Sequence, residues 1–245
     1  MSTAKIDTMQ ALRLKLRERH GAYAFKPKEL PPVTTTSPIY FWRGIDSDTA
    51  FLSMWFPSPF RDVHDPAKIY PTAEHYLCHH RALLFGDEET AAAILATGSP
   101  HRAKELVRRV ENFDDAVWHA ERGRIAADAN WYKFTRPIID SSSPLLPRGY
   151  PWQSQHMSET AKLQARDLKK ALLDTGEHRL VLGHPMDRYW GIGQAKGRAW
   201  PRREKWGLNM MGICLMELRE KLRTEEAGSQ AVDELTLSGI SFFSC

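Results

Sequence analysis

The sequence predicts a mainly α fold: a compact single domain with a few short β-strands. Several segments carry apolar residues at helical spacing, whereas only two short runs have the β-branched and aromatic content of strands. The chain has 245 residues, of which 42% are hydrophobic and 26% charged. A chain of this length and composition can bury a substantial core, so we expect most of it to fold.

The N-terminal part of the chain has few signals for regular structure. Met9, Leu12 and Leu16 lie on one helical face, which favours a short docking helix, with a transit peptide as the alternative. Residues 26–38 are rich in proline and threonine and predict an extended connection. The run IYFWRG at 39–44 then predicts the first strand.

The central part of the chain is predicted to be helical. After a segment broken by Pro57 and Pro59, apolar periodicity and capping residues mark successive helices. Ser99 and Pro100 are a typical start, because serine accepts a hydrogen bond as N-cap and proline fits the first helical position. We expect helices at 73–85, 87–96, 100–109 and 114–132.

The C-terminal part combines loops, a strand and amphipathic helices. Residues 137–157 are rich in proline and serine and predict a loop, and RLVLG at 179–183 predicts a strand. A helix from about 161 should end at Gly176, and a last helix should cover 211–222.

Composition limits the classes of function. The net charge of +4 is mildly basic, which permits a phosphate-bearing ligand or nucleic acid but requires neither. Three widely spaced cysteines argue against a disulfide framework and for a reducing compartment. No apolar run is long enough for a membrane-spanning helix, and the first residues lack the core of a secretory signal. We therefore expect a cytoplasmic or nuclear protein without membrane contact.

The stretch YPTAEHYLCHHRALLFGD at 70–87 carries many titratable groups near a helix start. With Thr72 as N-cap, Glu74 occupies the second helical position, where the helix dipole stabilises a negative charge by about 0.3–1 kcal/mol. This position predicts an ionised Glu74, although an ordinary first-turn acid would fit as well. His75 and His79 have a spacing that can bind zinc, but no second ligand pair follows, so we expect no metal.

Two later segments suggest a nucleotide-like ligand. Residues 187–191, DRYWG, place a carboxylate beside aromatic rings and flexible backbone, which suits a ligand that is part sugar and part base; an ordinary turn is the alternative. Residues 197–207, GRAWPRREKWG, interleave basic side chains with Trp200 and Trp206. This pattern can bind nucleic acid or a nucleotide diphosphate, or form solvated surface.

Read in order, the segments resemble a known family. The blocks are FWRG, FLSMWFPSPF, YPTAEHYLCHHRALLFGD, SPHRAKELVRRV, VWHAERGRIAADANWYKF, LLDTGEHRLVLGHPMDRYWGIG and GLNMMGICLMELREKL. This succession resembles the NADAR (NAD- and ADP-ribose-associated), or YbiA-like, family, over about residues 39–222. The resemblance implies an N-terminal extension at 1–38, a domain at 39–222 with an insertion at 141–157, and a tail at 223–245. The strongest signatures are the motif around Glu74 and the motif from Asp187 to Gly191. The sequences of these blocks are most similar to those of stand-alone eukaryotic members, especially fungal ones.

The resemblance implies a YbiA-like fold and an N-glycosidase that cleaves the bond between a ribose C1 and a base nitrogen, with no cofactor or metal. One branch of the family removes ADP-ribose from guanine in nucleic acids, and the basic segment 197–207 would then contact the polymer. Another branch acts on ribosylated pyrimidine phosphates of the riboflavin pathway, but this chain has no fused riboflavin-pathway domain. A non-catalytic module that binds ADP-ribose or NAD-derived nucleotides is the third alternative.

The resemblance also assigns candidate roles to residues. Glu74 would stabilise positive charge on the sugar or align a water molecule. Asp187 would hold a ribose hydroxyl or share the role of the base, and Lys104 would bind phosphate or trap the C1 aldehyde as an imine. The expected substrate-binding residues are Trp190, Trp118, Gly191, Arg81 and Asn209.

Overall fold

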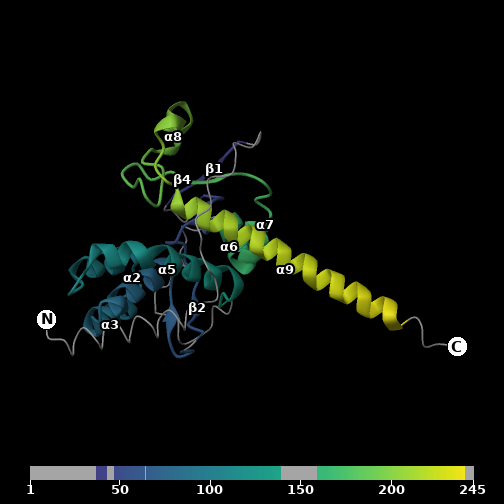
Figure 1. Cartoon of the computed structure of the whole chain (residues 1–245), viewed down its shortest axis with the longest axis horizontal. Helices are drawn as coiled ribbons and strands as arrows, with labels where there is room; N and C mark the ends of the chain where they lie inside the picture. Colours follow the sequence, from purple (N-terminus) through teal and green to yellow (C-terminus); the bar gives the residue numbers. More distant parts are fainter. Residues whose placement is uncertain (1–36, 43–46, 64, 139–158, 241–245) are drawn as a thin grey trace.

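The computed structural model describes residues 37–42, 47–63, 65–138 and 159–240 (Figure 1). Helices predominate and the strands are short, which confirms the predicted mainly α fold. The elements are β1 (Ile39–Phe41), η1 (Ala50–Leu52), β2 (Phe60–Arg61), β3 (Ile69–Tyr70), α2 (Ala73–Leu84), α3 (Glu88–Ala96), α4 (Pro100–Leu106), η2 (Val107–Arg109), α5 (Asp115–Thr135), α6 (Glu159–Arg166), α7 (Leu168–Leu173), β4 (Leu180–Leu182), α8 (Lys196–Ala199), η4 (Trp200–Lys205) and α9 (Met210–Ile240).

Polar N-caps define where the central helices begin. The side chain of Thr72 accepts a hydrogen bond from the backbone N–H of His75, so Glu74 is the second residue of α2, as predicted. Equivalent side-chain caps start α3, α4 and α5 at Asp87, Ser99 and Asp114. Each cap satisfies a backbone donor that the helix itself leaves without a partner.

Two helix boundaries near the C-terminus differ from the prediction. The helix expected from 161 to Gly176 is divided into α6 and α7, because Asp167 accepts a hydrogen bond from the N–H of Lys170 and caps a second helix. The last helix does not end at 222: α9 continues to Ile240 and extends away from the body of the molecule (Figure 1). Residues 1–36, 139–158 and 241–245, with most of the N-terminal extension and the whole 141–157 insertion, lie outside the described residues.

The strands form two small sheets. In one, β1 pairs in parallel with β4, with Ile39 opposite Leu180 and Phe41 opposite Leu182. In the other, β2 and β3 are antiparallel. Because β1 and β4 run in the same direction, the residues that follow them, Trp42 and 183–190, emerge at the same edge.

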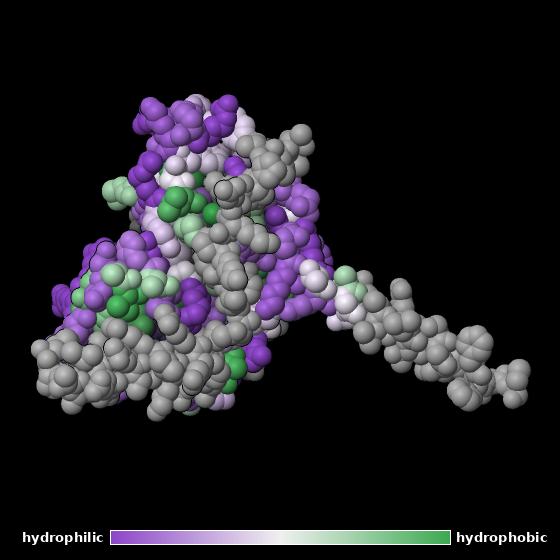
Figure 2. All heavy atoms as spheres, viewed as in Figure 1, coloured by the Kyte–Doolittle hydropathy of each residue, from purple (hydrophilic) through white to green (hydrophobic). Residues whose placement is uncertain are grey.

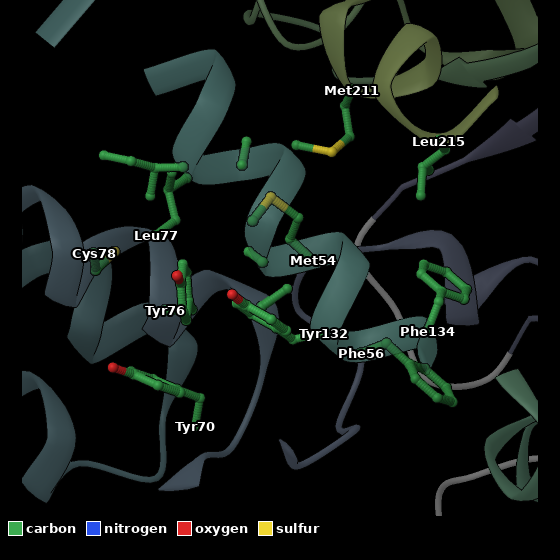
Figure 3. Packing of buried hydrophobic residues seen from close by; sticks show 14 of the residues in the cluster. Met54, Phe56, Tyr70, Tyr76, Leu77, Cys78, Tyr132, Phe134, Met211 and Leu215 are labelled. Atoms are coloured by element: carbon green, nitrogen blue, oxygen red, sulfur yellow. The ribbon is translucent and has the colours of Figure 1, made fainter. Parts of the chain in front are cut away.

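Aromatic rings join α2 to α5 in the core (Figure 3). The ring of Tyr76 lies 4.9 Å from that of Tyr70 and 5.7 Å from that of Tyr132, and all three are buried. Edge-on and tilted arrangements of this kind add attraction beyond the buried area. They fix α2, and with it Glu74, relative to β3 and α5. No helix within the described part of the chain is long and apolar enough to cross a membrane.

His75 makes the stability of the fold sensitive to acid. Its ring is fully buried, Nδ1 lies 2.8 Å from the Thr72 hydroxyl, and burial lowers its pKa from 6.5 to about 4. Between these values only the unfolded chain binds the proton, so stability should fall as pH drops from about 6.5 to about 4, by at most about 3 kcal/mol. Urea titrations across this range should show a shallower pH slope for His75→Asn than for the wild type. An unchanged slope in His75→Asn would contradict the assignment.

Candidate active site

A cavity of about 710 Å³ opens where the first turns of α2 meet the carboxyl ends of β1 and β4. Ligands commonly bind at the carboxyl ends of parallel strands, because loops from neighbouring strands meet there. The wall contains charged, aromatic and apolar side chains. The residues that line the cavity include Trp42, Met54, Trp55, Glu74, Cys78, Arg81, Lys104, Glu105, Arg108, Trp118, Met186, Asp187, Arg188 and Trp190.

Glu74 is the buried carboxylate of this cavity. Only 7% of the residue is exposed, its backbone N–H donates to the Met54 carbonyl at 3.0 Å, and the Trp55 indole N–H donates to its carboxylate. Burial raises the pKa of Glu74, while Lys104 and Trp55 oppose the rise. The sequence predicts that the start of the helix determines the charge state of Glu74. In the structure, desolvation has a larger effect on its pKa than the groups that favour the ionised form, so the predicted balance of these effects is wrong.

Lys104 brings an amine to the same point from another helix. Its Nζ lies 3.9 Å from Oε1 of Glu74 and 5.9 Å from the centre of the Trp55 ring. The Lys104 side chain is 43% exposed, whereas that of Glu74 is 9% exposed. The amine therefore lies on the solvent side of the carboxylate. A sugar carbon bound beside this pair could contact both groups.

Asp187 organises the turn that closes the cavity after β4. Its Oδ1 accepts hydrogen bonds from the N–H groups of Tyr189 at 3.0 Å and Trp190 at 2.8 Å, and its own N–H donates to Nδ1 of His184. Oδ2 has no hydrogen-bond partner among the described residues. One carboxylate oxygen therefore shapes the turn and the other remains available to a ligand hydroxyl.

The predicted aromatic and basic residues also meet here. Trp190 and Trp118 both line the cavity, and Trp190 packs edge-on against Tyr189 with ring centres 4.9 Å apart. The guanidinium carbon of Arg81 lies 4.3 Å from the centre of the Phe113 ring and 5.1 Å from that of Trp118. Such stacking holds a cation in place, so Arg81 presents a fixed positive charge on the wall.

Gly191 and Asn209, predicted to bind substrate, lie outside the cavity wall. A Cβ on Gly191 would lie 2.8 Å from the Leu182 carbonyl, so glycine is needed for close packing against β4. The buried Asn209 side chain accepts from the N–H of Leu182 at 2.9 Å and donates to the carbonyl of Leu180 at 2.8 Å. Both residues support the loop that carries Asp187, and the assignment of direct binding is corrected to this structural role.

Gly207 permits a close approach between this loop and the segment before α9. A Cβ there would lie 2.3 Å from the Arg188 carbonyl oxygen and 2.6 Å from the Arg188 Cα. We expect Gly207→Ala to lower the free energy of unfolding by about 1–3 kcal/mol, because backbone must move to relieve the overlap. Thermal and urea unfolding measure this. Gly197→Ala is the matched control, since no atom lies within 4 Å of its added Cβ; equal stability of the two variants would refute the packing argument.

Several cavity residues were not predicted from the sequence. Trp42 and Trp55 lie in blocks that were recognised, yet no spacing rule connects either to Glu74. Arg108, Arg188 and the 85%-exposed Met186 complete the rim. Met186 and Arg188 could have been predicted from the sequence only because they are the direct neighbours of Asp187.

The basic segment 197–207 lies beside the cavity. Its backbone is joined to the rim, because Nη1 of Arg188 donates to the Lys205 carbonyl at 3.1 Å. Trp206 is turned inward and donates to the Ala199 carbonyl, whereas Trp200 is 44% exposed. Figure 2 shows this region around α8 as strongly hydrophilic. The exposed basic side chains in and next to the segment are Lys196, Arg198, Arg202, Arg203 and Lys205.

The described residues contain no group of three or more His, Cys, Asp or Glu side chains that could hold a metal ion. His75 and His79, the pair with zinc-like spacing, have other partners. His75 contacts the Thr72 hydroxyl, and Nδ1 of His79 lies 3.1 Å from the Tyr70 hydroxyl. The cavity wall itself offers carboxylates, an amine, guanidinium groups and aromatic rings.

Comparison with known proteins identifies relatives over most of the chain. A family model, the NADAR domain, matches residues 40–223. An N-glycosidase of Acanthamoeba polyphaga mimivirus is 31% identical over 193 residues, covering 76% of this chain and 97% of that protein. An N-glycosidase of Nostoc punctiforme is 39% identical over 185 residues, covering 76% and 92%. The NMR structure of the E. coli protein YbiA is similar in fold, with a TM-score of 0.51, 24% identity and coverage of 82% of this chain and 94% of that one.

Proposed function

The chain belongs to the NADAR domain family and is an enzyme of the N-glycosidase type, and we propose that it releases ADP-ribose from an ADP-ribosylated nucleobase, guanine in nucleic acid. The observation that carries the proposal is the pairing of Glu74 and Lys104, 3.9 Å apart, in a cavity ringed by tryptophans. A carboxylate, an amine and stacking faces can act together to cleave a bond between a sugar and a base.

The reaction breaks the bond from ribose C1 to the base nitrogen and builds positive charge on the sugar. The carboxylate of Glu74 can stabilise that charge or accept a proton from the attacking water, and the departing base takes up a proton. Asp187 holds a ribose hydroxyl through Oδ2, and Trp190 stacks on the base. Arg81 offers its fixed charge to phosphate.

Lys104 supports a covalent variant of the same reaction. Its amine attacks C1, the base leaves with a proton, and the sugar ring opens to an imine. Water then hydrolyses the imine, which releases the sugar and restores the amine. The 3.9 Å between Glu74 and Lys104 is longer than a direct hydrogen bond, so a proton passes between them through one bridging water molecule.

The size of the cavity and its surroundings favour a large substrate. A volume of about 710 Å³ lies in the upper part of the range that ligand pockets span, about 300–1,000 Å³. The adjoining basic segment 197–207 suits a polynucleotide backbone, with Trp200 as a stacking face. A ribosylated pyrimidine phosphate would use the cavity alone, and simple binding of ADP-ribose would not require the Glu74–Lys104 pair.

Release of base from two substrates tests the proposal. We expect turnover of an oligonucleotide carrying ADP-ribosyl-guanine, with kcat/KM falling steeply as salt rises. The triple variant Arg198→Ser, Arg202→Ser, Arg203→Ser should lose roughly 10–100-fold in kcat/KM on the oligonucleotide and show a weaker salt dependence. Lys169→Ser with Lys170→Ser, on α7, is the matched control and should behave as wild type.

The same experiment separates the alternatives. Turnover of a ribosylamino-pyrimidine phosphate alone, insensitive to the triple variant, would replace the proposal by the metabolic one. Tight binding of ADP-ribose without release from either substrate would indicate a binding module.

A further inference from the structure

A lysine lies at the centre of the core behind the active site. Lys133, on α5, has no exposed surface, and its Nζ donates to the carbonyls of Phe51 at 2.6 Å and Ser53 at 2.7 Å. No carboxylate among the described residues pairs with it, and burial lowers its pKa. Burying an amine without a counter-charge is costly, and an apolar side chain would fill this space more cheaply.

The two carbonyls that Lys133 holds belong to the segment that contacts Glu74. Within segment 51–55, Phe51 and Leu52 belong to η1, whereas residues 53–55 are irregular chain that no helix or sheet ladder fixes. The Ser53 hydroxyl accepts from the Trp55 N–H at 3.1 Å, and the Met54 carbonyl accepts from the Glu74 N–H at 3.0 Å. The Trp55 indole donates to the Glu74 carboxylate. A continuous set of hydrogen bonds therefore runs from Lys133 to Glu74.

We propose that Lys133 is a positioning residue for the reaction: by anchoring the carbonyls of Phe51 and Ser53 it holds segment 51–55 in the conformation that fixes Trp55 and the carboxylate of Glu74. The inference rests on the role of Glu74 in the proposed function. Lys133 itself does not reach the cavity, since it is not part of the cavity wall. It acts through backbone, at a distance from the substrate.

Hydrogen exchange at the Glu74 amide tests the anchor without substrate, because this N–H donates to Met54. In Lys133→Met we expect that amide to exchange at least about tenfold faster, while the amide of Leu215 in α9 keeps its wild-type rate. Lys221→Met is the control, since Lys221 contacts Trp131 of α5 from outside. If Lys133→Met does not fold, Lys133→Gln replaces it, because its shorter side chain cannot reach both carbonyls.

Kinetics supply the second measurement. The variant should lose about tenfold in kcat with KM changed less than about threefold, because the substrate still binds but Glu74 is less well placed. Combining it with Trp55→Phe should add no further loss, since both changes remove the same support. Wild-type exchange at Glu74, or acceleration shared equally by Leu215, would overturn the proposal. Absence of base release from the ADP-ribosylated oligonucleotide by the wild type would instead refute the proposed function and leave the exchange result intact.

Discussion

Glu74→Gln is expected to lower kcat for base release by roughly 10²–10⁴ with little change in stability. The amide keeps the size of the side chain and can still contact Trp55, but it can neither neutralise a positive sugar nor accept a proton. Single-turnover release of base from the ADP-ribosylated oligonucleotide measures the loss. Glu105→Gln is the matched control: it lines the same cavity, but its carboxylate is paired with Arg102 at 3.0 Å and is partly exposed. Near-normal turnover in Glu74→Gln would remove this residue from the mechanism.

The pH profile of the wild type gives an independent check on the same role. Burial raises the pKa of Glu74, so its ionised form is lost at a higher pH than for an exposed glutamate. If the ionised form is the active one, kcat/KM should fall as pH drops through that raised pKa. The groups that face Glu74 are Lys104 from α4, Asp187 from the turn after β4 and Cys78 from α2 itself. Glu74→Gln should lack this acid limb.

Replacing Lys104 is expected to have the second largest effect. Lys104→Met should lower kcat by roughly 10²–10³, the usual cost of removing one charged group that acts on the transition state. Lys104→Arg separates two roles, because a guanidinium keeps the positive charge but does not form an imine with an aldehyde. Borohydride added during turnover should reduce an imine and attach the sugar to the wild-type protein, which mass spectrometry detects at Lys104.

The two Lys104 variants have distinguishable outcomes. Loss of activity in both, together with a trapped adduct, would support the covalent route. An active Lys104→Arg enzyme without an adduct would restrict Lys104 to binding phosphate or stabilising the departing base. Full activity in Lys104→Met would show that neither role is needed.

Local signals in the sequence predict the start of α2 well. Thr72 as N-cap and Glu74 as the second helical residue follow from short-range hydrogen-bonding rules, and the structure has both. The break between α6 and α7 arises because Asp167 caps a new helix and does not continue the first one. The spacing of apolar residues does not decide between these two outcomes. The sequence prediction ends the last helix at 222 because the next residues are polar, although the arginine, glutamate and glutamine that follow there are good helix formers.

The surroundings of Glu74 could not be predicted in the same way. Trp55 contacts Glu74, and Lys133 contacts the segment that carries Trp55, through tertiary packing alone, from parts of the chain with no local relation to α2. Asn209 illustrates the reverse error: a polar residue in a family block suggested a ligand contact, yet its amide completes the hydrogen bonds of β4. Residue type and order indicated which segments build the site. They did not indicate whether a given side chain faces the cavity or the core.

The pairing of β1 with β4 has a consequence for how the enzyme is made. It joins Ile39 near the start of the domain to Leu180 near its end, and the cavity lies at the edge that this pairing creates. Contacts between segments so distant in sequence form late in folding, because a long loop must first be closed. On the ribosome the chain should therefore remain inactive until α9 has begun to emerge. In refolding experiments, activity should return in one late step, after most of the helical structure has formed.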